Sequence, residues 1–170
     1  MTLLSVILCA VVLAPGSELL TRVERNFDRL EEPKYQPDNV FLTMEQSWGW
    51  PGDTEGRTIL ALVLDAQRTG RAPKHLDEIL RRLPSKLNER GYFGPVWTDA
   101  VNEQQLSGMG WVLRGFCAHY RWKRDPRTLT QIRTIADNLF LPAAEDFAAY
   151  PIDPKTRIRD VGGASGNTGN

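Results

Sequence analysis

The chain has 170 residues, of which 41% are hydrophobic and 25% are charged, a composition typical of a single globular domain with a real core. Its 21 basic and 21 acidic side chains cancel to a formal net charge of zero. Composition and charge therefore exclude a disordered or collagen-like chain, and they argue against nucleic acid as a partner, because a phosphate backbone requires a basic surface.

The first fourteen residues (1–14) form an apolar segment within the run MTLLSVILCAVVLAPGS. The run is as long as the apolar region of a secretory signal peptide and shorter than the ~20 residues that span a bilayer, so we expect no stable membrane span. Two interpretations stay open. A signal peptide would make the protein secreted or periplasmic, whereas a buried strand or helix at the domain edge would leave it cytoplasmic. A small membrane-attached helical protein is a further alternative that rests on this segment alone.

The next segment predicts an amphipathic helix, because apolar side chains recur at helical spacing over residues 19–30 and Ser17 can cap the helix. Over residues 31–53 this periodicity disappears, and prolines and glycine punctuate the chain. We therefore expect a long connection there, and long connections in compact domains are usually functional or disordered. Its aromatic content favours function.

A second helix is expected to begin at Asp53 or Thr54 and to end at Gly70, a typical C-terminal cap residue. Its apolar residues lie on nearly all sides, which predicts deep burial. A third helix is expected within residues 73–91, where leucines and an isoleucine share one stripe and Pro84 kinks or ends the helix.

A fourth helix is predicted from about residue 102 to residue 122, with three glycines in its interior, Gly108, Gly110 and Gly115. Each glycine costs roughly 1 kcal/mol relative to alanine in a helix interior. We therefore expect them to permit close approach of a neighbouring helix or a ligand. A fifth helix should start at the Asp125-Pro126 pair, and the tail over residues 164–170 should be flexible.

The sum is an all-α fold of helical hairpins with long aromatic-rich loops. Helix and connection alternate at roughly forty residues per pair, a spacing that suits a helical toroid or solenoid with its sites on one rim.

Two stretches place aromatic, glycine- and proline-containing loops directly before helices that open with acids and amides: SWGWPGDTEGR and GYFGPVWTDAVNEQQLSGMGW. Aromatic rings stack on the C–H faces of sugars, while carboxylates and amides bind hydroxyl groups in fixed directions. Carbohydrate is therefore the expected ligand class. The alternative is structural: Asp53 or Thr54, and likewise Asp99 or Asn102, can cap the helices, and the tryptophans can anchor the loops in the core.

Other chemistry finds little support in the sequence. Neither His75 nor His119 has a second ligand four residues later, and Cys9 and Cys117 show no metal-ligand spacing. Paired carboxylates are the usual machinery of glycoside hydrolysis, but spacing alone does not say which two would share a pocket.

Four stretches, YQPDNVF, GDTEGRTILAL, LNERGYFG and NEQQLSGMGWVLRGFCAHYRW, resemble the N-terminal portion of the catalytic domain of glycoside hydrolase family 127, which includes beta-L-arabinofuranosidases. The resemblance covers residues 15–163. It implies a partial (α/α)6 toroid with the substrate at one rim, followed by β-sandwich material. Met109 departs from the family pattern, which has a histidine in LSGxGW.

The resemblance also implies that catalytic residues and substrate-binding residues lie in different parts of the family's chain. Characterised members use a cysteine nucleophile beside a zinc ion held by cysteines and a glutamate, all in a later part of the chain, and this sequence contains none of those motifs. We therefore expect no catalytic residue and no metal ligand here, with zinc only in a full-length member. The substrate-binding residues implied by position are Trp48, Asp53, Trp97, Asn102, Glu103 and Gln104.

The expected function is that of a fragment of a glycoside hydrolase acting on furanosides such as beta-L-arabinofuranosides, one that contributes sugar-binding residues and is inactive alone. The alternative is a non-catalytic carbohydrate-binding or helical scaffold protein, so whether the chain is an enzyme stays open.

Overall fold

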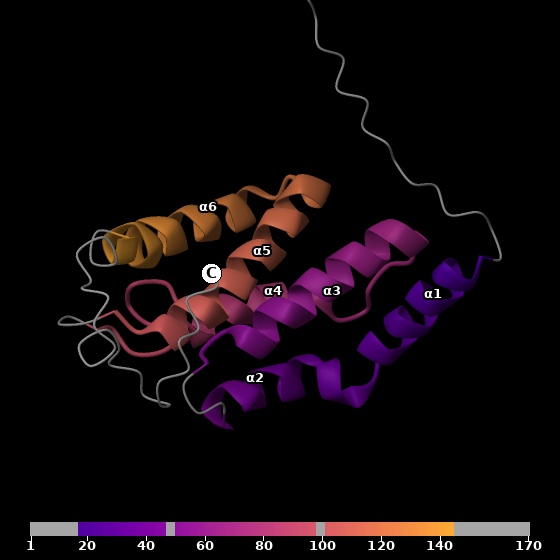
Figure 1. The fold of residues 1–170 in the computed structure, drawn as a ribbon, viewed down its shortest axis with the longest axis horizontal. Coiled ribbons are helices and arrows are strands. Elements are labelled where there is room, and N and C mark those ends of the chain that lie inside the picture. Colours follow the sequence, from indigo (N-terminus) through magenta and orange to yellow (C-terminus); the bar gives the residue numbers. More distant parts are fainter. Residues whose placement is uncertain (1–16, 47–49, 98–100, 145–170) are drawn as a thin grey trace, which may run out of the picture.

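The computed structural model describes residues 17–46, 50–97 and 101–144, and within these ranges it contains helices and no strand (Figure 1). This confirms the all-α prediction. The α-helices are α1 (Glu18–Leu30), α2 (Pro37–Gln46), α3 (Asp53–Thr69), α4 (Leu76–Arg82), α5 (Glu103–Lys123) and α6 (Pro126–Ile135). Short helical turns are η1 (Pro33–Tyr35), η2 (Leu83–Lys86) and the π-helical η3 (Ala136–Phe140). The predicted signal segment, Trp48 and the tail over residues 164–170 lie outside the described residues.

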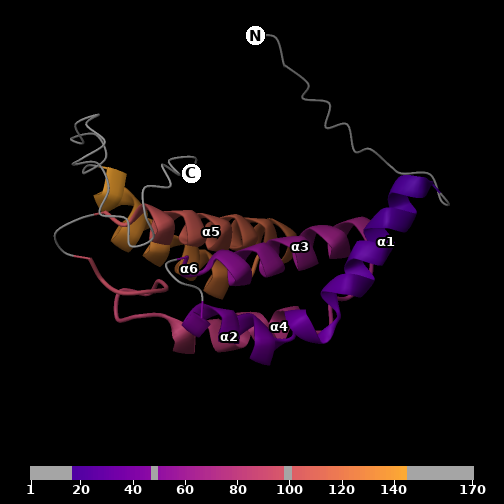
Figure 2. The ribbon, with the colours of Figure 1, turned by 60° about the horizontal axis from the view of Figure 1, so that its bottom comes forward.

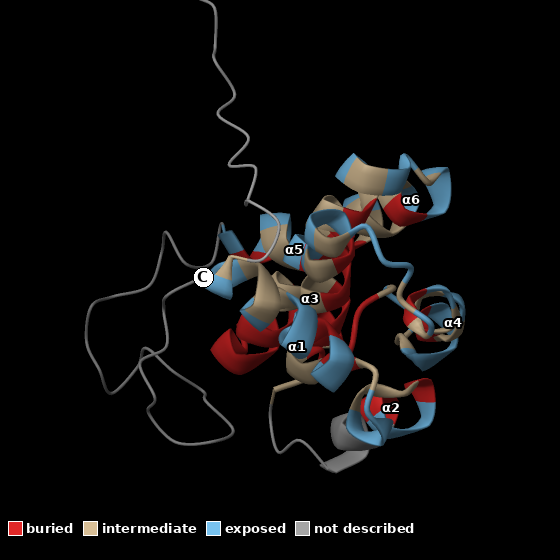
Figure 3. Cartoon of the chain, turned by 90° about the vertical axis from the view of Figure 1, so that its right-hand side faces the viewer, coloured by how far each residue is buried: buried red, intermediate tan, exposed pale blue. Residues whose placement is uncertain are grey.

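The helices form two layers. Helices α3 and α5 lie side by side and make the most extensive contact in the protein, while α2 and α4 form a separate layer beneath them (Figure 2). Seen from the side, α2, α4 and α6 all lie on the same side of the α3–α5 pair, and buried positions gather along α3 and α5 (Figure 3). The largest fully buried apolar side chains are Phe27, Val40, Ile59, Leu62, Leu76, Ile79, Leu83, Phe93, Met109 and Ile135.

Glycines let α3 and α5 run parallel at very short distance. A Cβ atom at Gly108 would lie 2.2 Å from the carbonyl oxygen of Pro51, and one at Gly115 would lie 3.0 Å from a side-chain carbon of Ile59. Later residues of α5 therefore contact later residues of α3, which means that the two helices are parallel. This confirms the close approach predicted for these two glycines, and it brings the N-terminal ends of α3 and α5 to the same end of the domain.

Helix termini follow the local sequence signals. The Ser17 hydroxyl accepts the backbone N–H of Leu20 at 3.2 Å, and Gly70 ends α3 with a left-handed φ of 73°. Asp125 caps α6 by accepting the backbone N–H of Arg127 at 2.9 Å. These three predictions are confirmed.

The long connection predicted over residues 31–53 is wrong, because α2 occupies its middle. Pro37 fixes φ at the start of α2, where a missing N–H costs nothing, and the Gln36 carbonyl accepts the backbone N–H of Val40 at 2.9 Å. Val40 and Phe41 are buried in the core, and Asp38 forms an ion pair with Arg82 of α4. Packing against α4 and α3 therefore supports a helix whose own sequence pattern is weak.

The expectation that α3 is buried on nearly all sides is also wrong. Ile59, Leu62 and Val63 are buried, but Leu64 is 49% exposed, because α2, α4 and α6 lie on only one side of the α3–α5 pair. None of the described helices is both long enough and apolar enough to cross a membrane.

Candidate functional site

Five polar side chains stand at the shared N-terminal end of α3 and α5, and we call them the polar end: Asp53 and Glu55 from α3, and Asn102, Glu103 and Gln104 from the start of α5. The parallel packing of the two helices brings together residues that lie some fifty positions apart in the sequence. Only Asp53 among them retains substantial exposure, with 24% of its side chain accessible. The other four are buried.

The Gln105 side chain fixes the loop that leads into α5. Its Nε2 donates to the carbonyl oxygens of Phe93 at 2.7 Å and Pro95 at 2.9 Å, and it is itself buried. Between these two acceptors, the Gly94 carbonyl accepts from the Asn88 side-chain amide at 2.7 Å. Residues 91–97 contain no regular secondary structure, but Gln105 holds them against α5 and Asn88 ties them to the chain that precedes them.

This loop places Trp97 beside Asn102. The two residues line one small cavity of about 80 Å³, and Trp97 is 37% exposed, so part of this residue is available at the surface. Asn102 is the N-cap of α5, where its Oδ1 accepts the backbone N–H of Gln105 at 2.9 Å. The cavity is much smaller than the ~300 Å³ at which ligand pockets begin, so it can hold at most an edge of a sugar ring.

Asp53 is engaged with its own helix instead of being free for a ligand. Its carboxylate oxygens accept from the Arg57 Nε at 2.9 and 3.0 Å. The Arg57 guanidinium lies 4.2 Å from the ring centroid of Trp111, and the Arg114 guanidinium lies 4.8 Å from the same centroid. Asp53 is also not the N-cap of α3, because Gly52 occupies that position with a φ of 88°. The capping role expected for Asp53 is therefore wrong, whereas that of Asn102 is confirmed.

Glu55 is the residue that the sequence reasoning missed. It is only 1% exposed, and among the described residues its Oε1 has no hydrogen-bond partner. Burial raises the pKa of Glu55 to about 7, a rise to which the neighbouring Asp53 carboxylate adds and which a backbone hydrogen bond opposes. A signal was present in the sequence. Glu55 shares a helical stripe with Ile59, Leu62 and Ala66, so a carboxylate there had to face the interior.

Gln104, like Glu55, is buried and has a side-chain oxygen that is unpaired within the described ranges. It is 3% exposed, and its Oε1 is buried without a partner in the described part of the chain. Glu103, one residue earlier, is buried as well. Unpaired buried oxygens are uncommon in proteins and costly, which makes two of them at one end of a helix pair a notable feature.

Met109, which stands where the family pattern has a histidine, belongs to the core. It is fully buried, and its sulfur accepts the backbone N–H of Phe93 at 3.4 Å. No three histidine, cysteine, aspartate or glutamate side chains of the described ranges gather closely enough to hold a metal ion. The zinc ion that the resemblance implies for complete family members therefore finds no ligand set among these residues.

Comparisons of the chain with protein-family models, with curated protein sequences and with solved structures found no match. The family resemblance accordingly rests on the sequence motifs alone.

Proposed function

We propose that the polar end binds a carbohydrate, as the sugar-binding part of a glycoside hydrolase acting on furanosides such as beta-L-arabinofuranosides. The observation that carries the proposal is the pair of unpartnered, buried oxygens on Glu55 and Gln104, which stand at the same end of two parallel helices. Sugar hydroxyl groups are donors that would satisfy such acceptors.

Two further features support a sugar as the ligand. Trp97 is partly exposed next to Asn102, and an aromatic residue beside hydrogen-bonding groups matches the apolar faces and the hydroxyl groups of a sugar. A Glu55 carboxyl group with a pKa near 7 can donate as well as accept at neutral pH, and hydroxyl groups use both kinds of partner.

The two-layer arrangement is also compatible with the proposed partial (α/α)6 toroid. In such a toroid the inner helices run parallel to one another and the outer helices cover them on one side. Here α3 and α5 are the parallel pair, and α2, α4 and α6 lie on one side of it. Ligands that bind at one rim would then meet the end where both inner helices begin.

Calorimetric titration of the full chain with arabinofuranosyl oligosaccharides tests this proposal. We expect saturable binding that Gln104→Met and Trp97→Ala each weaken about tenfold, since each removes roughly 1–2 kcal/mol of contact. Trp122→Ala, in the last turn of α5, is the matched control and should leave binding unchanged. Equal binding of maltose, or equal loss in the control, would argue against the proposal.

The alternative function is a non-catalytic carbohydrate-binding or helical scaffold protein. Release of arabinose from a beta-L-arabinofuranosyl substrate by the purified chain would assign hydrolysis to it. Binding without turnover would leave a binding module, and absence of both would leave a scaffold.

A further inference from the structure

A second cavity, of about 660 Å³, opens between α4–η2 on one side and α5 and α6 on the other. Its α5 residues are Phe116, His119 and Lys123, so it lies toward the C-terminal end of α5, whereas the polar end lies at the N-terminal end of the same helix. Its volume falls within the range of roughly 300–1,000 Å³ that is usual for small-molecule sites. It is therefore large enough for a ligand and separate from the proposed sugar site.

The α5 side of this cavity changes from apolar to polar to charged toward the C-terminal end of the helix. Phe116, His119 and Lys123 occupy successive turns of one face, and all three line the cavity. Phe116 is buried and apolar, His119 is buried and polar, and Lys123 is exposed. Opposite Phe116, η2 contributes the buried Leu83. The cavity thus has an apolar inner part, a polar middle and a cationic outer part.

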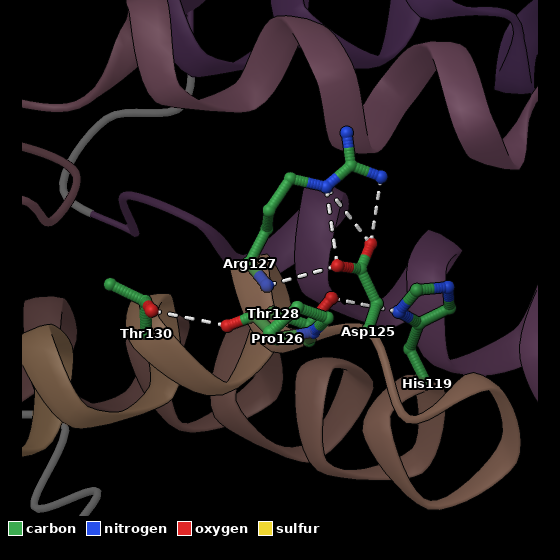
Figure 4. Close-up of polar contacts among 6 residues, drawn as sticks. All are labelled: His119, Asp125, Pro126, Arg127, Thr128 and Thr130. Atoms are coloured by element: carbon green, nitrogen blue, oxygen red, sulfur yellow. Dashed lines mark hydrogen bonds and ion pairs between the residues drawn. The ribbon is translucent and has the colours of Figure 1, made fainter.

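His119 supplies the hydrogen-bonding group of the middle part. Its Nδ1 lies 2.9 Å from the Thr128 hydroxyl, and the second ring nitrogen, Nε2, points away from Thr128 (Figure 4). Burial lowers the pKa of His119, so the ring is neutral at neutral pH. In the tautomer protonated at Nε2, the Thr128 hydroxyl donates to Nδ1 and the Nε2–H remains able to donate to a ligand. Gln131 also lines the cavity, and its buried Oε1 has no partner among the described residues.

The charged side chains that line the cavity include one more base than acid. The acids are Asp77 and Asp125, and the bases are Arg81, Lys123 and Arg127. Asp125 and Arg127 neutralise each other, because the Arg127 Nη2 lies 2.9 Å from the Asp125 Oδ2 (Figure 4).

Arg81 has a weak partner, with its Nη2 3.5 Å from a Glu78 oxygen that also pairs with Arg82. Within the described ranges no carboxylate lies within ion-pair distance of the Lys123 ammonium, which instead lies 3.7 Å from the Trp122 ring centroid. Lys123 is therefore the lining cation that has no carboxylate partner within the described ranges, and its ammonium group is the charge that a ligand would meet at the rim.

From this arrangement we infer that the cavity binds a small amphipathic carboxylate, with its apolar body against Phe116 and Leu83 and its carboxylate group near His119 and Lys123. An anionic head matches the Lys123 ammonium at the rim and the neutral donor beside it. An apolar tail matches the inner wall, and the removal of the tail itself from water supplies the driving force. The site is independent of the proposed sugar site.

Calorimetric titration of the full chain with sodium octanoate tests the inference. We expect saturable binding that tightens roughly tenfold for each two methylenes along the series butyrate, hexanoate and octanoate. Lys123→Gln should weaken octanoate binding about fivefold, the usual effect of removing one partly exposed charge contact. The control Arg121→Gln removes an equal charge from the same helix outside the cavity and should leave affinity unchanged.

Matched ligands distinguish the proposed recognition from general adsorption of apolar chains. Octylamine and octanol, which carry the same tail with a cationic or neutral head, should bind at least tenfold more weakly than octanoate. The inference is overturned if these ligands bind as well as octanoate, if chain length has no effect, or if Lys123→Gln and Arg121→Gln act alike. Competition by an arabinofuranosyl oligosaccharide would also overturn it, because the two sites are at opposite ends of α5.

Discussion

The carbonyl oxygen of Pro51 lies against the Cα of Gly108, so closely that a Cβ atom at position 108 would stand 2.2 Å from it. This contact fixes where α3 begins along the axis of α5, because Pro51 directly precedes Gly52, the N-cap of α3. Any side chain at position 108 would have to push the two helices apart at the polar end.

Gly108→Ala should therefore destabilise the protein strongly. We expect a loss of about 3 kcal/mol or more in the free energy of unfolding, since the overlap exceeds the ~1 kcal/mol that alanine gains in helix propensity. Urea denaturation followed by far-ultraviolet circular dichroism measures the effect. Gly70→Ala is the control: a Cβ atom there would meet no neighbouring atom within 4 Å, and only the positive φ penalises alanine, by about 1 kcal/mol. Similar losses in both variants would contradict the close contact.

Gln105→Met should release the loop that carries Trp97. The substitution preserves side-chain volume but leaves the carbonyl oxygens of Phe93 and Pro95 without their donor. Each lost hydrogen bond to a buried group costs about 1 kcal/mol or more, so we expect a total of roughly 2–3 kcal/mol. Amide hydrogen exchange should become faster over residues 91–97. Gln67→Met, on the exposed surface of α3, should change neither quantity.

Local signals in the sequence predicted most of the helix boundaries. Ser17, Gly70 and Asp125 act through their own backbone neighbourhoods, so their roles could be read without knowing the fold. Helix α2 could not be predicted in this way, because its buried residues Val40 and Phe41 are adjacent and give no helical period. Its stability comes from packing against α3 and α4, which the local sequence of α2 does not reveal.

The sequence predicted only part of the candidate site, because some of its features depend on packing between elements. Asp53 and Glu55 lie two residues apart, and only Glu55 shares the apolar helical stripe of α3, a signal that the choice of Asp53 overlooked. Asp53 lies off that stripe and pairs with Arg57. The proximity of Trp97 and Asn102 depends on a loop conformation fixed by Gln105, which no periodic pattern encodes.

Glu55→Gln should make stability less dependent on pH. The pKa of Glu55 rises from 4.5 in the unfolded chain to about 7 in the folded protein, so the unfolded state releases its proton first. The contribution of this carboxyl group to stability is therefore most favourable below pH 4.5, declines as the pH rises to 7, and is constant above that. The full loss is about 3 kcal/mol, from a difference of 1.36 kcal/mol per pKa unit.

Glu55→Gln lacks this loss of stability, because its amide is neutral in both the folded and the unfolded state. It should exceed the wild type in stability by about 1–3 kcal/mol near pH 8, with a smaller gain near pH 5. Urea unfolding at the two pH values measures the gain, with Glu24→Gln on the exposed surface of α1 as the control for loss of one negative charge. A gain that is equal at both pH values would argue against a buried, protonated Glu55.

Thr128→Val should weaken the packing of α6 on α5. The Thr128 hydroxyl is the partner of the His119 Nδ1 at 2.9 Å, and both side chains are buried (Figure 4). Valine has nearly the same shape but leaves the ring nitrogen unpaired in the interior, which should cost about 1–3 kcal/mol of unfolding free energy. Thr130→Val, two residues later, removes an exposed hydroxyl that donates to the Pro126 carbonyl within the same helix, and it should cost no more than about 0.5 kcal/mol. Thermal unfolding of the two variants side by side measures the difference. Equal losses would mean that the buried contact between His119 and Thr128 contributes no more to stability than a hydroxyl at the surface.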